Sequence, residues 1–191
     1  MLAVARNREV KVILGAALTN QLGWHSTNEQ WLDISSAEDW AGIFKSKKLI
    51  KCAVAEHVFE HLTPKQMEKA LGLIYQHMPT GSTIRIAVPD GNHPKEEYRR
   101  NTGIGGIGDD AADHKQFLTV ETLKVALELA GFSVIHQEGY AKDGSLKENF
   151  LDPKFGHIKR SRSASKLQIE SEGWNFIDSQ TSLVVDGIKN V

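Results

Sequence analysis

The chain has 191 residues, of which 23 are Lys or Arg and 24 are Asp or Glu, so its formal net charge is -1. This balance argues against a nucleic-acid coat protein or a polybasic membrane binder, because both depend on a strong positive field. The composition, 40% hydrophobic and 25% charged, is that of a globular protein, and the length suits one domain over residues 1–191. The chain opens without a secretory pattern, and its longest apolar run is far below the roughly 20 residues that cross a bilayer. We therefore expect a cytoplasmic protein that does not enter the membrane.

Short apolar runs alternate with helical patterns along the chain, which predicts βα units and a parallel sheet covered by helices. We expect strands at 10–14, 31–34, 49–55, 82–88, 132–136 and 182–185. Two helices have clear start signals. Thr63, Pro64 and Gln66 form a capping box with proline in the first turn, and a second helix runs over 119–130 and ends at Gly131.

The turn after the first predicted strand has the small residues Gly15, Ala16 and Ala17, and Asp33 ends the next predicted strand. In α/β folds such a turn lets a nucleotide-like ligand approach the backbone, and a carboxylate at the second strand accepts hydrogen bonds from ribose hydroxyls. Only one glycine is present, so a simple strand-exit turn is an equal alternative.

Four segments of the chain resemble class I S-adenosylmethionine-dependent methyltransferases, in particular a group of predicted methyltransferases. They are LGAA at 14–17, AEHVFEHLT at 55–63, RIAVPDG at 85–91 and DHK at 113–115. The segments at 156–161 and 181–186 are also similar to that group, so the resemblance spans nearly the whole chain. It implies a Rossmann-like, doubly wound and mostly parallel α/β sheet with an antiparallel final strand. The implied reaction is methyl transfer from S-adenosylmethionine. The two polar loops, 92–115 and 142–173, lead us to expect a small polar acceptor.

The resemblance also implies a cofactor site. Gly15, Ala16 and Ala17 match the turn beside the methionine part of the cofactor, and Asp33 lies where these enzymes bind the ribose. The implied site departs from the family at residue 17, where glycine is usual, and in 18–30, which is short for the first crossover helix and predicts only an abbreviated one. These departures favour an alternative function, a non-catalytic domain that keeps the fold for binding.

Two further segments match the cofactor site of the family. Asp39 and Trp40 match the pair that borders the adenine, with core packing as the alternative for Trp40. Ala55, Glu56 and His57 match the segment beside the transferred methyl group.

The pattern H-x-x-E-H at His57, Glu60 and His61 is also typical of an inverted zinc-peptidase motif. That motif needs both histidines on one face of a helix and a distant third ligand. The alternative is a structural role for Glu60 and His61 beneath the following helix, and the same letters occur in the methyltransferase resemblance without a metal.

Polar side chains in the long loop over 92–115 are candidates for catalysis. Asp113 and His114 lie in a matched motif and could supply a general base, and Asp90 and His93 are second candidates. A basic run over 154–166 could hold a phosphate-bearing acceptor, although a solvated loop is the more common meaning of such a run. Without interleaved aromatic residues the run does not favour nucleic-acid binding.

Overall fold

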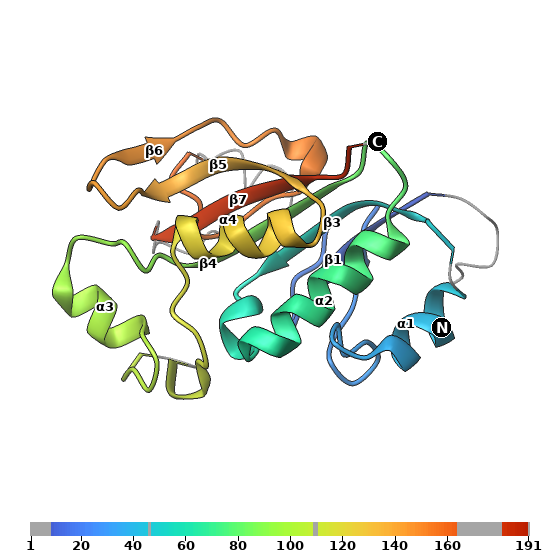
Figure 1. Cartoon of the computed structure of the whole chain (residues 1–191), viewed down its shortest axis with the longest axis horizontal. Helices are drawn as coiled ribbons and strands as arrows, with labels where there is room; N and C mark the ends of the chain where they lie inside the picture. Colours follow the sequence, from blue (N-terminus) through green and yellow to red (C-terminus); the bar gives the residue numbers. More distant parts are fainter. Residues whose placement is uncertain (1–8, 46, 109–110, 164–180, 191) are drawn as a thin grey trace.

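The computed structural model describes residues 9–45, 47–108, 111–163 and 181–190. Seven strands form one sheet in the order β2-β1-β3-β4-β7-β5-β6 (Figure 1). Their bounds are Val10–Leu14 (β1), His25–Ser26 (β2), Ile50–Glu56 (β3), Thr83–Pro89 (β4), Ser133–Tyr140 (β5), Leu146–Glu148 (β6) and Ser182–Ile188 (β7). Strands β2, β1, β3 and β4 are parallel to one another. Strand β7 is antiparallel to both of its neighbours, β4 and β5, and β6 is antiparallel to β5. The mostly parallel α/β sheet with an antiparallel final strand is confirmed.

The structure describes four α-helices, and the two with clear sequence signals begin where those signals place them. The four helices are α1 (Ala37–Phe44), α2 (Pro64–His77), α3 (Glu96–Thr102) and α4 (Val120–Leu129). The Thr63 hydroxyl accepts from the backbone N–H of Gln66, and the Gln66 side chain accepts from the N–H of Thr63, which completes the predicted capping box. Thr119 and Thr122 form an equivalent box for α4. Among the described residues, no helix is long and apolar enough to cross a membrane.

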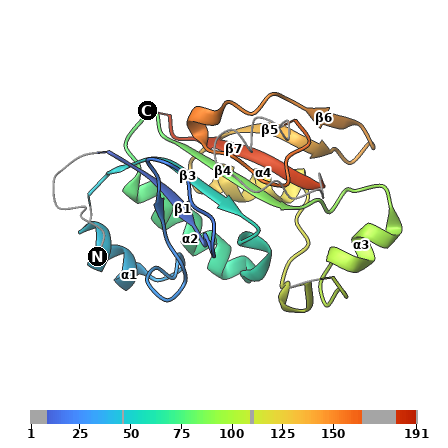
Figure 2. The ribbon, with the colours of Figure 1, turned by 180° about the vertical axis from the view of Figure 1, so that it is seen from behind.

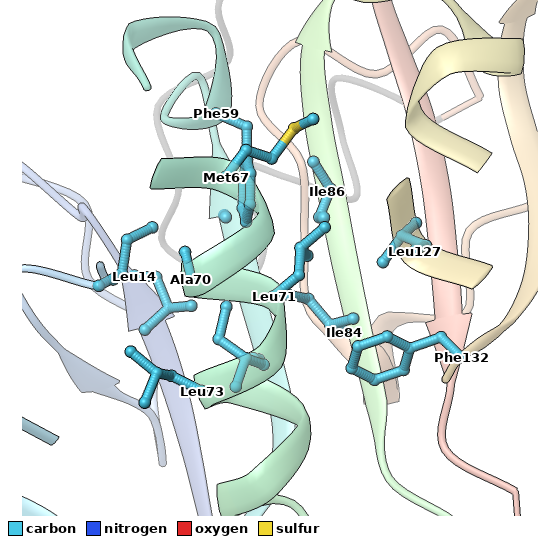
Figure 3. Close-up of a cluster of buried hydrophobic side chains, with 14 of the residues drawn as sticks. Leu14, Phe59, Met67, Ala70, Leu71, Leu73, Ile84, Ile86, Leu127 and Phe132 are labelled. Atoms are coloured by element: carbon cyan, nitrogen blue, oxygen red, sulfur yellow. The ribbon is translucent and has the colours of Figure 1, made fainter. Parts of the chain in front are cut away.

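Helices α1, α2 and α4 lie on one face of the sheet, and Figure 2 shows the sheet from behind with these helices on its far side. Alternate strand residues, among them Ala55, Ile84 and Ile86, face the helices and are fully buried. They pack against Leu71 of α2 and Leu127 of α4 in the main core (Figure 3). Each buried Leu or Ile side chain stabilises the fold by about 1.5–3 kcal/mol relative to an exposed one.

The opposite face of the sheet is covered by an irregular segment, residues 149–163, which we call the strap. Its side chains Leu151 and Ile158 pack on Val54 and Val184, with Trp24 at the edge of this smaller cluster. The abbreviated helix expected within 18–30 does not form; those residues are turns and the short strand β2. The strap therefore covers sheet surface that a first crossover helix would otherwise bury.

Buried charges hold the strap to the sheet. The Arg85 guanidinium, 1% exposed, donates to the Gly156 carbonyl at 2.6 Å and the Asp152 carbonyl at 3.1 Å. Glu138, fully buried, accepts from the Ser161 hydroxyl at 2.5 Å. A Cβ at Gly156 would lie 2.2 Å from a methyl group of Val54, so only glycine lets the strap approach this closely.

The strand predicted at 31–34 is wrong. The second strand is β2. Its pairing with β1 continues one residue further, because the backbone N–H of Thr27 donates to the Ile13 carbonyl at 2.8 Å. Residues 31–34 instead form turns that lead into α1. Leu32 and Ile34 are buried in the main core, which explains their apolar spacing without a strand.

Candidate functional site

The turn after β1 is shaped by a close contact with the loop after β3. Gly15 has φ +61°, and a Cβ at this position would lie 2.6 Å from Cγ2 of Val58. The Ala16 N–H donates to the Thr27 carbonyl at 2.7 Å, and Ala17 has φ +47°. Gly15 and Ala17 are exposed, so the turn presents its backbone at the carboxyl end of β1. Open α/β sheets bind their ligands at this edge.

Two connected hollows flank this turn. The turn hollow, about 320 Å³, lies between the turn and the strap, and its lining includes Gly15, Ala16, Ala17, Glu56, His57 and Arg160. The outer hollow, about 460 Å³ and more open, shares Gly15 and Ala17 with it and is completed by Asn28, Glu29 and Gln30. Five of the predicted cofactor residues thus lie together, while Ala55 is fully buried beneath them.

Glu56 and His57 link β3 to its surroundings. The Glu56 carboxylate accepts the backbone N–H groups of Lys159 at 3.1 Å and Arg160 at 2.9 Å, which fastens the strap over the end of β3. His57 has φ +55°, and its Nε2 lies 3.1 Å from the Ser182 hydroxyl. Glu56 is therefore both a wall of the turn hollow and an anchor of the strap.

Asp33, Asp39 and Trp40 organise the start of α1. Asp33 accepts from the backbone N–H and the hydroxyl of Ser35, both at 2.8 Å, and the N–H of Asp33 donates to the Asp39 carboxylate at 2.8 Å. Trp40 is 0% exposed, and its indole N–H donates to the Ile34 carbonyl at 2.9 Å. None of the three lines the hollows around Gly15 within the described ranges, and Trp40 has the core position that was its alternative.

Asn28, Glu29 and Gln30 were not singled out from the sequence. The parallel register, Ile13 opposite Ser26, brings them beside the turn. Glu29 is the first acidic residue after β2. The sequence pattern that would place Glu29 after a strand was weak, because β2 has only two residues and no alternation of apolar side chains.

A further hollow, about 340 Å³, lies beyond His57, and we call it the histidine hollow. It is lined by His57, Glu60, His61, Asn101, His114 and Arg160, among others, and so shares His57 and Arg160 with the turn hollow. The structure thus brings residues from the segment after β3, from α3 and the loop that follows it, and from the strap to one place.

His114 and Asp113 occupy different positions at the histidine hollow. His114, 7% exposed, lines the hollow and donates from Nδ1 to the Thr102 carbonyl at 2.8 Å. Asp113 is 74% exposed, and its carboxylate lies 3.3 Å from Nδ1 of His61. The two predicted catalytic residues therefore act on different neighbours and do not form a pair with each other.

The zinc-peptidase prediction is wrong. Glu60 and His61 belong to a short 3-10 helix, Phe59–His61, that ends before α2, and His57 lies outside it in a left-handed turn. The peptidase motif requires two histidines on successive turns of one α-helix. His57 instead lies with its Nδ1 3.0 Å from the Glu60 carboxylate.

Asp90 and His93 hold the loop that follows β4. Asp90, fully buried, accepts from the N–H groups of Asn92 at 3.0 Å and Tyr140 at 2.8 Å, and burial raises the pKa of its carboxyl group. Burial, together with the positive charge of Arg162, lowers the pKa of His93. Neither residue lines the three hollows described above.

The basic run over 154–166 divides into parts with different surroundings. Lys154 forms an exposed ion pair with Asp152 at 2.6 Å, whereas Arg160 lines both the turn hollow and the histidine hollow. Lys166 lies outside the described residues.

Comparison with known proteins gives concordant results. Residues 6–137 match the sequence profile of a family described as a methyltransferase domain. No curated protein sequence matches the chain. Similar solved structures include a SAM-dependent methyltransferase from Archaeoglobus fulgidus (16% identity, TM-score 0.54, covering 95% of this chain and 86% of that one). A possible histamine N-methyltransferase from Thermotoga maritima is similar as well, with 13% identity and a TM-score of 0.53, covering 95% of this chain and 82% of that one. At these identities the structural likeness establishes the fold.

Proposed function

This chain belongs to the methyltransferase-domain family, and on that basis we propose that it transfers a methyl group from S-adenosylmethionine to a small polar acceptor. The family and the fold together indicate S-adenosylmethionine as the cofactor. The observation that carries the proposal is the continuity of the three hollows along the carboxyl edge of the parallel strands, with the Gly15 turn and His57 at the two junctions.

The residues around the turn fit such a cofactor. The turn hollow lies in the range of about 300–1,000 Å³ that is usual for small-ligand sites. The exposed backbone at Gly15 allows the cofactor to approach closely. Polar groups of Glu56, His57 and Arg160 line the other side of the turn hollow. We place the methionine part here and the ribose in the outer hollow, where the Glu29 carboxylate can accept hydrogen bonds from its hydroxyls. Glu29 thereby takes the role that the sequence assigned to Asp33.

The acceptor, in this proposal, occupies the histidine hollow in contact with His114. This hollow shares His57 and Arg160 with the turn hollow, so an acceptor there would lie next to the methyl group. Alignment of acceptor and methyl group supplies much of the rate enhancement in such a transfer. Asp113, exposed at the rim, lies beside His61 and does not itself remove a proton.

Two charge-neutralising variants test the position of the cofactor. We expect isothermal titration calorimetry to detect binding of S-adenosylmethionine and of its demethylated product. Glu29→Gln should weaken binding by about tenfold or more, because a hydrogen bond to a charged group contributes about 1.5–3 kcal/mol. Asp33→Asn should leave the affinity within about twofold. Absence of binding for both ligands at millimolar concentration would refute the function, and a loss confined to Asp33→Asn would refute the position of the ribose.

We further propose that residues 1–191 act as one domain with no nucleic-acid partner. All seven described strands belong to one sheet, and the net charge of -1 supports a small acceptor.

A further inference from the structure

Glu60, His61 and His114 bring one carboxylate and two imidazoles together in the histidine hollow. Glu60 and His61 belong to the 3-10 helix after β3, and His114 follows the 3-10 helix Ala111–Asp113. One ligand atom from each of the three residues lies within 4.8 Å of the other two. A tetrahedral zinc ion, with bonds of 2.0–2.2 Å, keeps its ligand atoms roughly 3.4 Å apart. The side chains therefore need to close by only about 1–1.5 Å to share one ion.

The Glu60 carboxylate is buried without enough donors. Its side chain is 1% exposed, and neither oxygen has a hydrogen-bond donor among the described residues. Oε1 lies 3.0 Å from Nδ1 of His57, but this contact is not aligned as a hydrogen bond. The buried amide oxygen of Asn101 lines the same hollow and also lacks a donor. Uncompensated acceptors of this kind are costly in a protein interior, and a cation would satisfy them.

A hydrogen bond fixes the orientation of His114, and a carboxylate lies beside the ring of His61. Because a carbonyl can only accept, His114 carries a proton on Nδ1 toward Thr102, so the neutral tautomer has its free lone pair on Nε2. The Asp113 carboxylate lies 3.3 Å from Nδ1 of His61, beside the ring but not aligned as a hydrogen bond. Carboxylates and carbonyls play this supporting role for most histidine ligands of metals.

We propose that the histidine hollow binds one divalent transition-metal ion of the zinc type through Glu60, His61 and His114. Two imidazoles with a single carboxylate favour such an ion over Mg²⁺, which prefers oxygen ligands. Three protein ligands leave a coordination position open. Resting on the proposed function, we assign that position to a hydroxyl oxygen of the acceptor, next to the turn hollow that holds the methyl donor.

This arrangement makes the acceptor an oxygen nucleophile. The metal lowers the pKa of the bound hydroxyl, whose proton leaves to water. The oxygen then forms a bond to the methyl carbon, while the carbon–sulfur bond breaks and its electron pair stays on sulfur. The products are a methyl ether, the demethylated thioether and one proton.

Metal binding is tested on the full chain after treatment with EDTA. Titration with Co²⁺ should give one equivalent bound at micromolar or lower Kd, with visible absorption bands of a low-coordinate site, and Zn²⁺ should displace it. Glu60→Gln and His114→Ala should each weaken Co²⁺ binding by at least 30-fold. The matched controls Glu148→Gln and His25→Ala, both exposed and outside the hollow, should bind as the natural protein does.

Folding does not confound this test. The metal-free Glu60→Gln protein should melt at least as high as the metal-free natural protein, because the change removes a buried uncompensated charge. Zn²⁺ should then raise the melting temperature of the natural protein but not that of Glu60→Gln. Failure of Co²⁺ and Zn²⁺ to bind, equal binding by Glu60→Gln, or saturation by Mg²⁺ in preference to Zn²⁺ would overturn the assignment.

The open position has its own readout. Acetohydroxamate, a small oxygen chelator, should shift the visible spectrum of the Co²⁺-loaded protein, and an unchanged spectrum would refute binding of the acceptor oxygen to the metal. Calorimetry with the demethylated cofactor on metal-free protein tests the proposed function independently. Cofactor binding without a metal would leave that function standing, and metal binding without cofactor binding would refute it while sparing the metal site.

Discussion

The buried ion pair between Arg85 and Asp186 joins two strands of the sheet, and the same arginine also holds the strap. Arg85 on β4 donates from Nε and Nη2 to the two carboxylate oxygens of Asp186 on β7, both at 2.8 Å, and the two side chains are 1% and 3% exposed. The same guanidinium donates from Nη1 to the carbonyls of Asp152 and Gly156 in the strap. Its removal would leave a buried carboxylate and two carbonyls with fewer partners.

We expect Arg85→Met to destabilise the fold by about 3–5 kcal/mol, the usual cost of removing one member of a buried pair. Asp186 would keep one donor, the Gln137 amide at 2.8 Å. Such a loss is a large part of a total stability of about 5–15 kcal/mol. At about 2–4 °C per kcal/mol for a chain of this size, the melting temperature should fall by roughly 6–20 °C.

Circular dichroism during urea and thermal unfolding measures this effect. The double variant Arg85→Met/Asp186→Leu should recover part of the stability, because it removes the unpaired charge but not the unpaired carbonyls of the strap. A single variant within 1 kcal/mol of the natural protein would refute the reasoning. So would a double variant no more stable than the single one.

Two other predictions concern the turn after β1 and the loop after β4. Gly15→Ala should destabilise the protein by about 2–4 kcal/mol, because alanine is strained in the left-handed backbone conformation and its Cβ clashes with Val58. Adding Val58→Ala should restore only the part of the stability that the clash removes. Urea unfolding that shows no loss of stability for Gly15→Ala would contradict this prediction. Burial and Arg162 lower the pKa of His93, so the unfolded chain binds the proton more readily. The stability that His93 contributes is therefore present above about pH 6.5 and is lost as the pH falls through its lowered folded pKa. In His93→Gln the free energy of unfolding should fall less steeply on acidification, by at most about 1.4 kcal/mol per pH unit. If the slope of unfolding free energy against pH is unchanged between pH 7 and 5, His93 is not the group responsible.

Elements with strong local signals could be read from the sequence. The strands β1, β3, β4 and β7 follow from β-branched runs, and α2 follows from its capping box at Thr63, because backbone conformation there depends on neighbouring residues. The resemblance also identified the turn at Gly15 and the polar residues Glu56 and His57, which line one hollow. Asp33 was assigned to that site from its spacing and the resemblance, and Trp40 from the resemblance. Neither kind of signal distinguishes a ligand wall from the core.

The amino-acid sequence alone thus determined the class of fold and the segments that carry its chemistry. The tertiary structure decided which residues meet: Arg85 with the strap, Glu29 with the Gly15 turn, and Glu60 with His114. Each of these arrangements brings together different segments of the chain and depends on a strand register, a left-handed turn or a buried charge. No local preference encodes such a contact, because its free energy exists only once the sheet has formed and water has been excluded.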